Sequence, residues 1–238
     1  IAFALNSRTG GAAVGVYSTV SRSVVATPVT VSADQQIVSL AYAHGVVYAG
    51  MTGGSGGAAV VAYDVTTKQV IDTSVPSSNA HRIDSLAASD AGVLYGVADT
   101  TLFAIDTDTM NVVKRKSFYA TGATGNVVLA DGKLTASIAG KIYNVNPQDF
   151  KSDYLMNGSH VAVNSFGDYY YSRDGGLYRK LMPREASAAS GIRSVGGGVN
   201  LSLIDLRFGI SSAMLILAII AIPVLKLHWH RPTYVLRR

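Results

Sequence analysis

The chain has 238 residues, of which 48% are hydrophobic and 15% are charged, so its composition excludes an intrinsically disordered protein. Cysteine is absent, which excludes disulfide bonds and thiolate catalysis. The net charge of +5 comes almost entirely from Lys226, Arg231, Arg237 and Arg238. The rest of the chain is nearly neutral, so no nucleic-acid partner is expected.

A short apolar segment recurs along the first part of the chain. "GGAAVGVY" begins at Gly10 and "GGAAVVAY" begins at Gly56. Equivalent short apolar strands start at Val14, Val60, Leu102, Ile142 and Leu177. Short polar residues that favour turns follow four positions later, at Ser18, Asp64, Asp106 and Asn146. The pattern predicts a repeated hairpin.

The second half of each unit also recurs. "IVSLAYAHGVVYAG" and "NVVLADGKLTAS" both place a glycine-containing turn between two apolar strands. Four strands in about 40–45 residues is the period of a β-propeller blade. We therefore predict an all-β fold of four-stranded antiparallel blades over residues 1–182, with an antiparallel sandwich as the alternative.

The repeat register predicts that the chain begins inside a blade. Val47, in the strand before Val60, has its equivalent in Ile1, before Val14. Three full units lie between this partial unit and another that begins at "GGLYRKLM". We expect either part of a longer propeller or blades supplied by another chain, and a compact four-bladed ring is the alternative.

The hairpin phrases resemble those of a known group of propellers. "VVAYDVTTKQVI" and "LFAIDTDTMNVV" are similar to the blade phrase of quinoprotein-like and YVTN-type repeats, in which an Asp-x-x-Thr turn joins two strands. The resemblance implies a propeller fold. Quinoprotein enzymes carry a recurrent blade tryptophan, whereas the one tryptophan here is Trp229, outside the repeats. No cofactor is therefore expected.

The C-terminal part has a different composition. Residues 183–207 are rich in Gly, Ser and Ala and are predicted to form a flexible linker. Residues 208–227 begin with eighteen consecutive uncharged residues, Phe208 to Leu225, long enough for a transmembrane helix, with a buried core helix as the alternative. The expected anchor residues are Phe208, Leu215, Ile219, Leu225, Lys226 and Trp229.

The basic residues after this segment predict its orientation. They place the short tail, residues 228–238, in the cytoplasm and the propeller outside the cell membrane. A tail-anchored protein that faces the cytosol is the competing topology. His228 and His230 lack a third ligand, so no metal site is expected.

Tyrosines provide the candidate ligand-binding residues. In "DYYYS", strand alternation places Tyr169 and Tyr171 on one face, where they could stack on a sugar or peptide. The sequence shows no combination of residues typical of a catalytic site. We therefore expect a binding or scaffold module with a protein or glycan partner, either on its own or as a subunit of a membrane complex. The alternative is a propeller glycosidase or lyase whose catalytic residues lie partly in missing blades.

Overall fold

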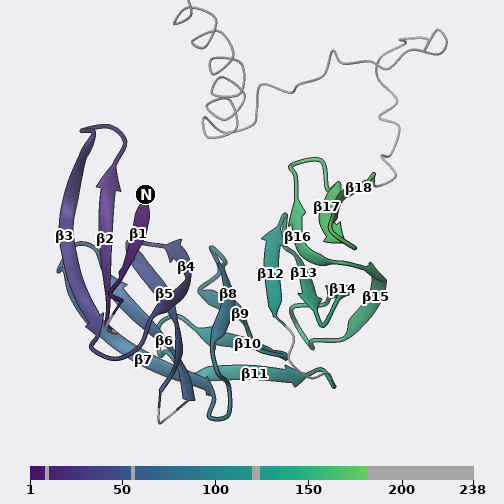
Figure 1. The fold of residues 1–238 in the computed structure, drawn as a ribbon, viewed down its shortest axis with the longest axis horizontal. Coiled ribbons are helices and arrows are strands. Elements are labelled where there is room, and N and C mark those ends of the chain that lie inside the picture. Colours follow the sequence, from purple (N-terminus) through teal and green to yellow (C-terminus); the bar gives the residue numbers. More distant parts are fainter. Residues whose placement is uncertain (9–10, 55–56, 120–123, 182–238) are drawn as a thin grey trace, which may run out of the picture. The chain divides into compact units, whose positions relative to one another are not determined.

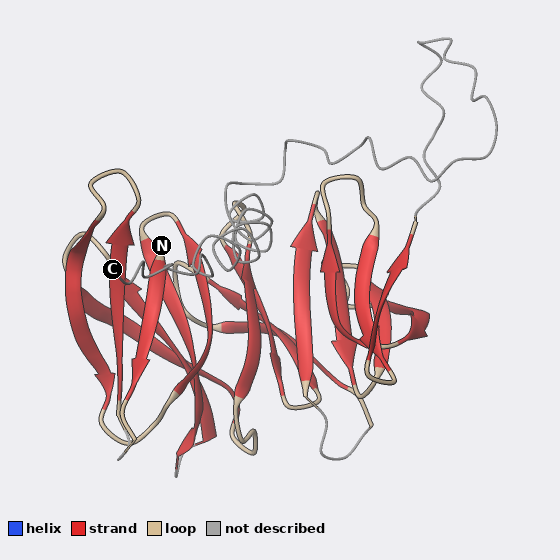
Figure 2. Cartoon of the chain, turned by 45° about the horizontal axis from the view of Figure 1, so that its top comes forward, coloured by secondary structure: helices blue, strands red, loops and turns tan. Residues whose placement is uncertain are grey.

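A computed structural model describes residues 1–8, 11–54, 57–119 and 124–181 of the protein. The described residues form five antiparallel sheets connected by turns and loops (Figures 1 and 2). Three sheets have four strands, and the first and last have three. This organisation confirms the prediction of an all-β protein built from four-stranded blades.

The strands follow the chain without crossovers within any sheet. The first two sheets are β1 (Ala2–Asn6), β2 (Ala12–Ser18) and β3 (Ser23–Ser32), then β4 (Ile37–Ala43), β5 (Val46–Gly54), β6 (Gly57–Asp64) and β7 (Gln69–Ser77). The next two are β8 (Ile83–Ala88), β9 (Val93–Ala98), β10 (Thr101–Asp106) and β11 (Val112–Ser117), then β12 (Gly125–Ala130), β13 (Lys133–Ile138), β14 (Lys141–Val145) and β15 (Ser152–Asn157). The last sheet is β16 (Ser159–Val163), β17 (Tyr169–Arg173) and β18 (Gly176–Lys180).

The recurring apolar segments are the third strands of the blades. Val60 lies in β6, and the other repeat positions lie in β2, β10, β14 and β18. Each complete sheet, however, begins with the second half of the sequence repeat, at Ile37, Ile83 and Gly125. Among the described strands, the first sheet has no counterpart of the first strand, and β1 corresponds to the second strand β5.

The turn between the third and fourth strands has one repeated geometry. Asp64 Oδ1 accepts hydrogen bonds from the amides of Thr66 and Thr67, at 2.7 and 3.2 Å. Four residues after each polar turn residue, the backbone adopts a positive φ, at Arg22, Lys68, Met110 and Phe150. This left-handed residue completes a short hairpin turn.

A separate hydrophobic cluster fills each junction between consecutive sheets. Val14 and Val47 meet between the first two sheets, Val60 and Ile105 between the next two, and Ile142 packs with Val161 further along. The central strand β6 is buried on both faces, because alternate side chains enter two different clusters. The blades consequently stabilise one another through packing.

The first strands of neighbouring blades contact one another and are joined by polar side chains. Ser39 Oγ in β4 donates to the Ile83 carbonyl in β8 at 2.8 Å. Asn126 in β12 donates to the Val161 carbonyl at 2.7 Å and accepts from the Val161 amide at 2.8 Å. These bonds fix the position of one blade against the next.

Candidate functional site

The predicted tyrosines lie at the junction of the fourth and fifth sheets. Tyr169 and Tyr171 belong to one buried cluster with Ile142 and Val161, so strand alternation places them on the same face. The Tyr169 hydroxyl donates to Asn144 Oδ1 at 3.0 Å. The Tyr171 ring stacks on Tyr178 with 5.6 Å between ring centroids. Ligand binding by the pair stays a prediction.

Tyr169 also lines a small pocket between these two sheets. Its volume is about 160 Å³, and a water molecule takes up about 30 Å³ of liquid, so it has room for one amino-acid side chain or a few waters. Phe166 is 46% exposed. The lining residues are Ala130, Asp131, Lys133, Thr135, Val163, Phe166, Gly167 and Tyr169. The lining thus combines two aromatic rings with one acidic and one basic side chain.

Hydrogen bonds within the loop hold Phe166 in place. Asn164 Oδ1 accepts from the amides of Phe166 and Asp168, at 3.0 and 2.9 Å. The Asn164 amide donates to the Asp168 carbonyl at 3.1 Å, and the Gly167 amide donates to the Asn164 carbonyl at 2.9 Å. Gly167 has a φ of +80°, a conformation that glycine adopts without strain. The loop therefore presents Phe166 from a fixed backbone.

An ion pair between the buried Asp168 and the partly exposed Arg179 supports this loop. The Asp168 side chain is fully buried, and Arg179 Nη2 in β18 donates to its Oδ2 at 2.7 Å. The hydrogen bond to Asp168 raises the pKa of Arg179. The Arg179 guanidinium also lies over the ring of Tyr170, 5.5 Å from its centroid. The pair connects β18 to the loop that carries Phe166.

A second charged cluster lies at the start of β8. Asp84 is almost completely buried, pairs with Arg82, and accepts from the Gly125 amide at 3.3 Å. Burial raises the pKa of the Asp84 carboxyl, and the Arg82 charge opposes the shift. Asp99 accepts from the His81 amide at 2.8 Å and lies 3.1 Å from His81 Nδ1. The described residues contain no group of three potential metal ligands.

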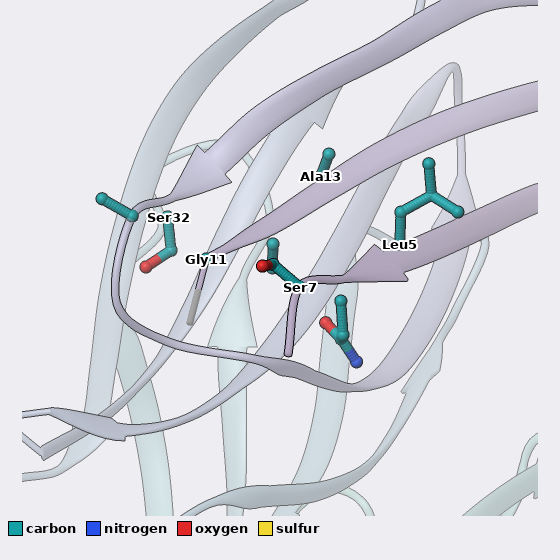
Figure 3. A pocket seen from close by; sticks show the side chains of 8 residues that line it. Leu5, Ser7, Gly11, Ala13 and Ser32 are labelled. Atoms are coloured by element: carbon teal, nitrogen blue, oxygen red, sulfur yellow. The ribbon is translucent and has the colours of Figure 1, made fainter. Parts of the chain in front are cut away.

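A shallow pocket of about 450 Å³ lies on the first sheet, where β1 and β3 end and β2 begins (Figure 3). Its lining is made of small and polar residues with one large apolar side chain, Leu5, which is 50% exposed. The lining residues are Leu5, Asn6, Ser7, Gly11, Ala12, Ala13, Ser32 and Ala33. It offers backbone edges and apolar surface rather than a set of catalytic groups.

Phe166, Asp168 and Arg179 are not expected from the sequence to belong to a site. In the sequence, only the turn-forming residues Asn164 and Gly167 indicate that this loop has a fixed backbone. The ion pair and the pocket arise from contacts between separate strands. Neither follows from the local sequence pattern.

The predicted linker, transmembrane segment and basic tail, residues 183–238, lie outside the described residues. This also applies to the expected anchor residues, from Phe208 to Trp229. Among the residues that the structure describes, no helix is long and apolar enough to cross a membrane.

Comparisons with known proteins identify the fold. No family model and no curated protein matches the chain. The solved structure described as RRP9 WD40 repeats is similar, with a TM-score of 0.58 and 8% identity, over 75% of this chain and 56% of that one. A structure of U3-55K gives a TM-score of 0.57 and 8% identity, over 75% and 57% of the two chains. The chain spans little more than half the length of these neighbours, and its described part folds into four-stranded antiparallel blades that resemble those of WD40 propellers.

Proposed function

We propose that the protein is a non-enzymatic binding or scaffold module that recognises another protein. In this proposal the blades form a rigid support, and the pocket beside Tyr169 receives one side chain of the partner. Propellers suit such a role because their loops form broad surfaces on a fixed framework. The exposed surface of Phe166 next to this pocket is the observation that carries the proposal.

The pocket is better matched to a peptide side chain than to a small-molecule substrate. Its volume of about 160 Å³ is below the range of about 300–1,000 Å³ typical of small-molecule sites. Asp131 and Lys133 offer both charges at its lining, and the rings of Phe166 and Tyr169 offer apolar contact. A glycan that stacks on Phe166 is the second kind of partner compatible with this surface.

The proposal includes attachment to the cell membrane. The uncharged segment within residues 208–227 serves as a single transmembrane helix, with the propeller outside and residues 228–238 in the cytoplasm. Residues 183–207 connect the two parts. The module would then act at the cell surface or as a subunit of a membrane complex.

A closer relation to quinoprotein-like or YVTN-type repeats is also part of the proposal. The Asp-x-x-Thr turns support it, because Asp106 Oδ1 accepts from both the amide and the hydroxyl of Thr109, at 2.9 and 3.0 Å. The amide of Thr67 likewise donates to Asp64. The shared element would be this turn geometry, without the cofactor of the enzymes.

The full chain in its native membrane provides the test. After solubilisation in a mild detergent, we expect it to migrate in a complex larger than its own mass. Phe166→Ala should release the partner, whereas Tyr154→Ala, which removes an aromatic ring that is 57% exposed on β15, should not. Migration at the mass of the chain alone, or equal retention in both variants, would contradict the proposal. Release by soluble oligosaccharide would identify a glycan instead.

A further inference from the structure

The junction between β15 and β16 carries a sequence pattern that accepts N-linked sugars. Asn157, Gly158 and Ser159 match the pattern Asn-x-Ser, in which x is not proline. Asn157 is the last residue of β15, the end strand of its sheet, and it is exposed. A bulky group attached to its side chain would therefore extend into solvent and not into a core.

One contact orients the side-chain amide of Asn157. The Tyr154 hydroxyl donates to Asn157 Oδ1 at 3.0 Å. The other amide atom, Nδ2, is the atom to which an N-linked sugar is attached, and it has no hydrogen-bond partner among the described residues. A substituent on this nitrogen would consequently break no contact of the folded protein.

A β-bulge brings Tyr154 and Asn157 to the same face of β15. Residues three apart in a regular strand point to opposite faces of the sheet. Here the register with β14 shifts between Ile142 and Tyr143, so Leu155 is an extra residue without a partner on β14. The contact between the tyrosine hydroxyl and the acceptor amide depends on this irregularity.

Tyr154 is the most exposed member of a row of three aromatic rings. The ring centroids of Phe118 and Tyr143 lie 5.0 Å apart, and those of Tyr143 and Tyr154 lie 6.2 Å apart. Phe118 and Tyr143 are half-buried, whereas Tyr154 is 57% exposed. The exposed ring thus offers apolar surface to a sugar ring beside the acceptor nitrogen.

The blade repeat does not require an aromatic side chain at this position. In the two preceding four-stranded sheets, the residues at the same place in the ladder are Thr73 and Arg115. Both are polar. The ring of Tyr154 is therefore specific to the blade that carries the acceptor asparagine.

We propose that Asn157 carries an N-linked glycan whose first sugar packs on the ring of Tyr154. In the transfer, Asn157 Nδ2 attacks the anomeric carbon of a lipid-linked oligosaccharide. A C–N bond forms, the bond from that carbon to the lipid pyrophosphate breaks, and the nitrogen gives up one proton to a base of the transferase. The lipid pyrophosphate is the leaving group. This inference rests on the proposed location of the propeller outside the cell membrane, because the transfer takes place on that side.

The protein purified from its own membranes provides the first test. Trypsin cleaves after Lys151 and Arg173 and releases residues 152–173 as one peptide. Mass spectrometry should find this peptide mainly with the added mass of a glycan, and fragmentation should locate the glycan on Asn157. A peptide that is mainly unmodified would overturn the proposal.

Two variants at Ser159 test whether the acceptor pattern is responsible. Ser159→Ala removes the hydroxyl that the pattern requires and should abolish the modification of Asn157. Ser159→Thr keeps a hydroxyl at the same position and should leave the modification in place. A glycan that persists in Ser159→Ala would contradict an N-linked site.

A new acceptor site separates this proposal from the proposed topology. Thr19→Asn creates the same pattern in an exposed turn of the first sheet, because Ser21 follows two residues later. Sugar at the new site but not at Asn157 would overturn the glycan at Asn157 and leave the topology intact. Sugar at neither site would also overturn the proposal, and protease access to the propeller in intact cells would then show whether the topology holds.

Thermal unfolding tests the packing of the sugar on Tyr154. Tyr154→Phe keeps the ring and removes the hydroxyl, whereas Tyr154→Ala removes both. In the Tyr154→Phe chain, loss of the glycan through Asn157→Gln should lower the melting temperature by about 3 °C, because the stacking contact is lost. In the Tyr154→Ala chain, the same change should lower it by less than about 1 °C. Equal shifts in the two chains would show that the sugar does not pack on the ring.

Discussion

Two buried tyrosines differ in whether the hydroxyl makes a hydrogen bond. The Tyr63 side chain is fully buried, and its hydroxyl has no hydrogen-bond partner within the described residues. Burial raises the pKa of Tyr63, because the charged phenolate is poorly solvated there. The Tyr169 hydroxyl, also buried, donates to Asn144.

The two tyrosines should therefore respond differently to loss of the hydroxyl. Tyr63→Phe removes an unpaired polar group and should raise the free energy of unfolding by about 1 kcal/mol. Tyr169→Phe removes a hydrogen bond that is made and should lower it by about 1 kcal/mol. Urea unfolding of both variants measures the difference. A loss of stability in Tyr63→Phe would show that its hydroxyl is paired in solution.

The turn aspartates predict a dependence of stability on pH. Hydrogen bonds from the Thr109 amide and hydroxyl, and from the Asp108 amide, lower the pKa of Asp106. An aspartate in the unfolded chain has a pKa of about 3.9. Since the pKa of Asp106 is lower in the folded chain, its stabilising contribution is complete above the pKa of the unfolded chain. The contribution is lost as the pH falls through the pKa of the folded chain.

Substitution at Asp106 separates charge from hydrogen bonding. Asp106→Ala should lower the melting temperature by about 3 °C at pH 7, and the loss should shrink as the pH falls through the lowered pKa of Asp106. Asp106→Asn should retain most of the stability at pH 7, because Asn146 already accepts from the Gln148 amide at 2.8 Å in the equivalent turn. Thermal melts from pH 2 to 7 provide the measurement. Equal losses in both variants at pH 7 would contradict this account.

At the level of elements, side-chain bonds between first strands connect the blades. Asn126→Ala would leave the amide and carbonyl of Val161 without their partner, and Val161 is 2% exposed. We expect a loss of about 2 kcal/mol in the free energy of unfolding. Asn111→Ala, in the exposed turn before β11, provides the control and should change stability by less than about 0.5 kcal/mol. Similar losses in the two variants would contradict a special role for the link.

The sequence predicted the individual strands and turns better than it predicted which strands form one sheet. The strand at Val60 and the turn at Asp64 followed from alternation and turn chemistry, and both are present. A repeat has no intrinsic starting point, so the start of each sheet at a residue such as Ile37 could not be read from it. The Asp168–Arg179 pair and the link from Asn126 to Val161 join residues from different strands and leave no local pattern.

For the whole molecule, the proposed attachment to the membrane predicts one orientation of the chain. With a small epitope added after Arg238, we expect protease to reach the propeller from outside intact cells but to leave the epitope intact. Replacement of Lys226, Arg231, Arg237 and Arg238 by alanine should reduce the fraction of chains in this orientation. Complete release of the unaltered chain by alkaline carbonate would show that residues 208–227 do not span the bilayer.

The positive φ that recurs after the third strands has a consequence for how far such blades can diverge. Arg22, Lys68, Met110 and Phe150 share this dihedral angle although their side chains are basic, flexible or aromatic. The first two are exposed, and the last two are buried. The hairpin is therefore compatible with unrelated side chains at this position, provided that the residue there adopts the positive φ. Two chains of this fold can therefore superimpose at 8% identity.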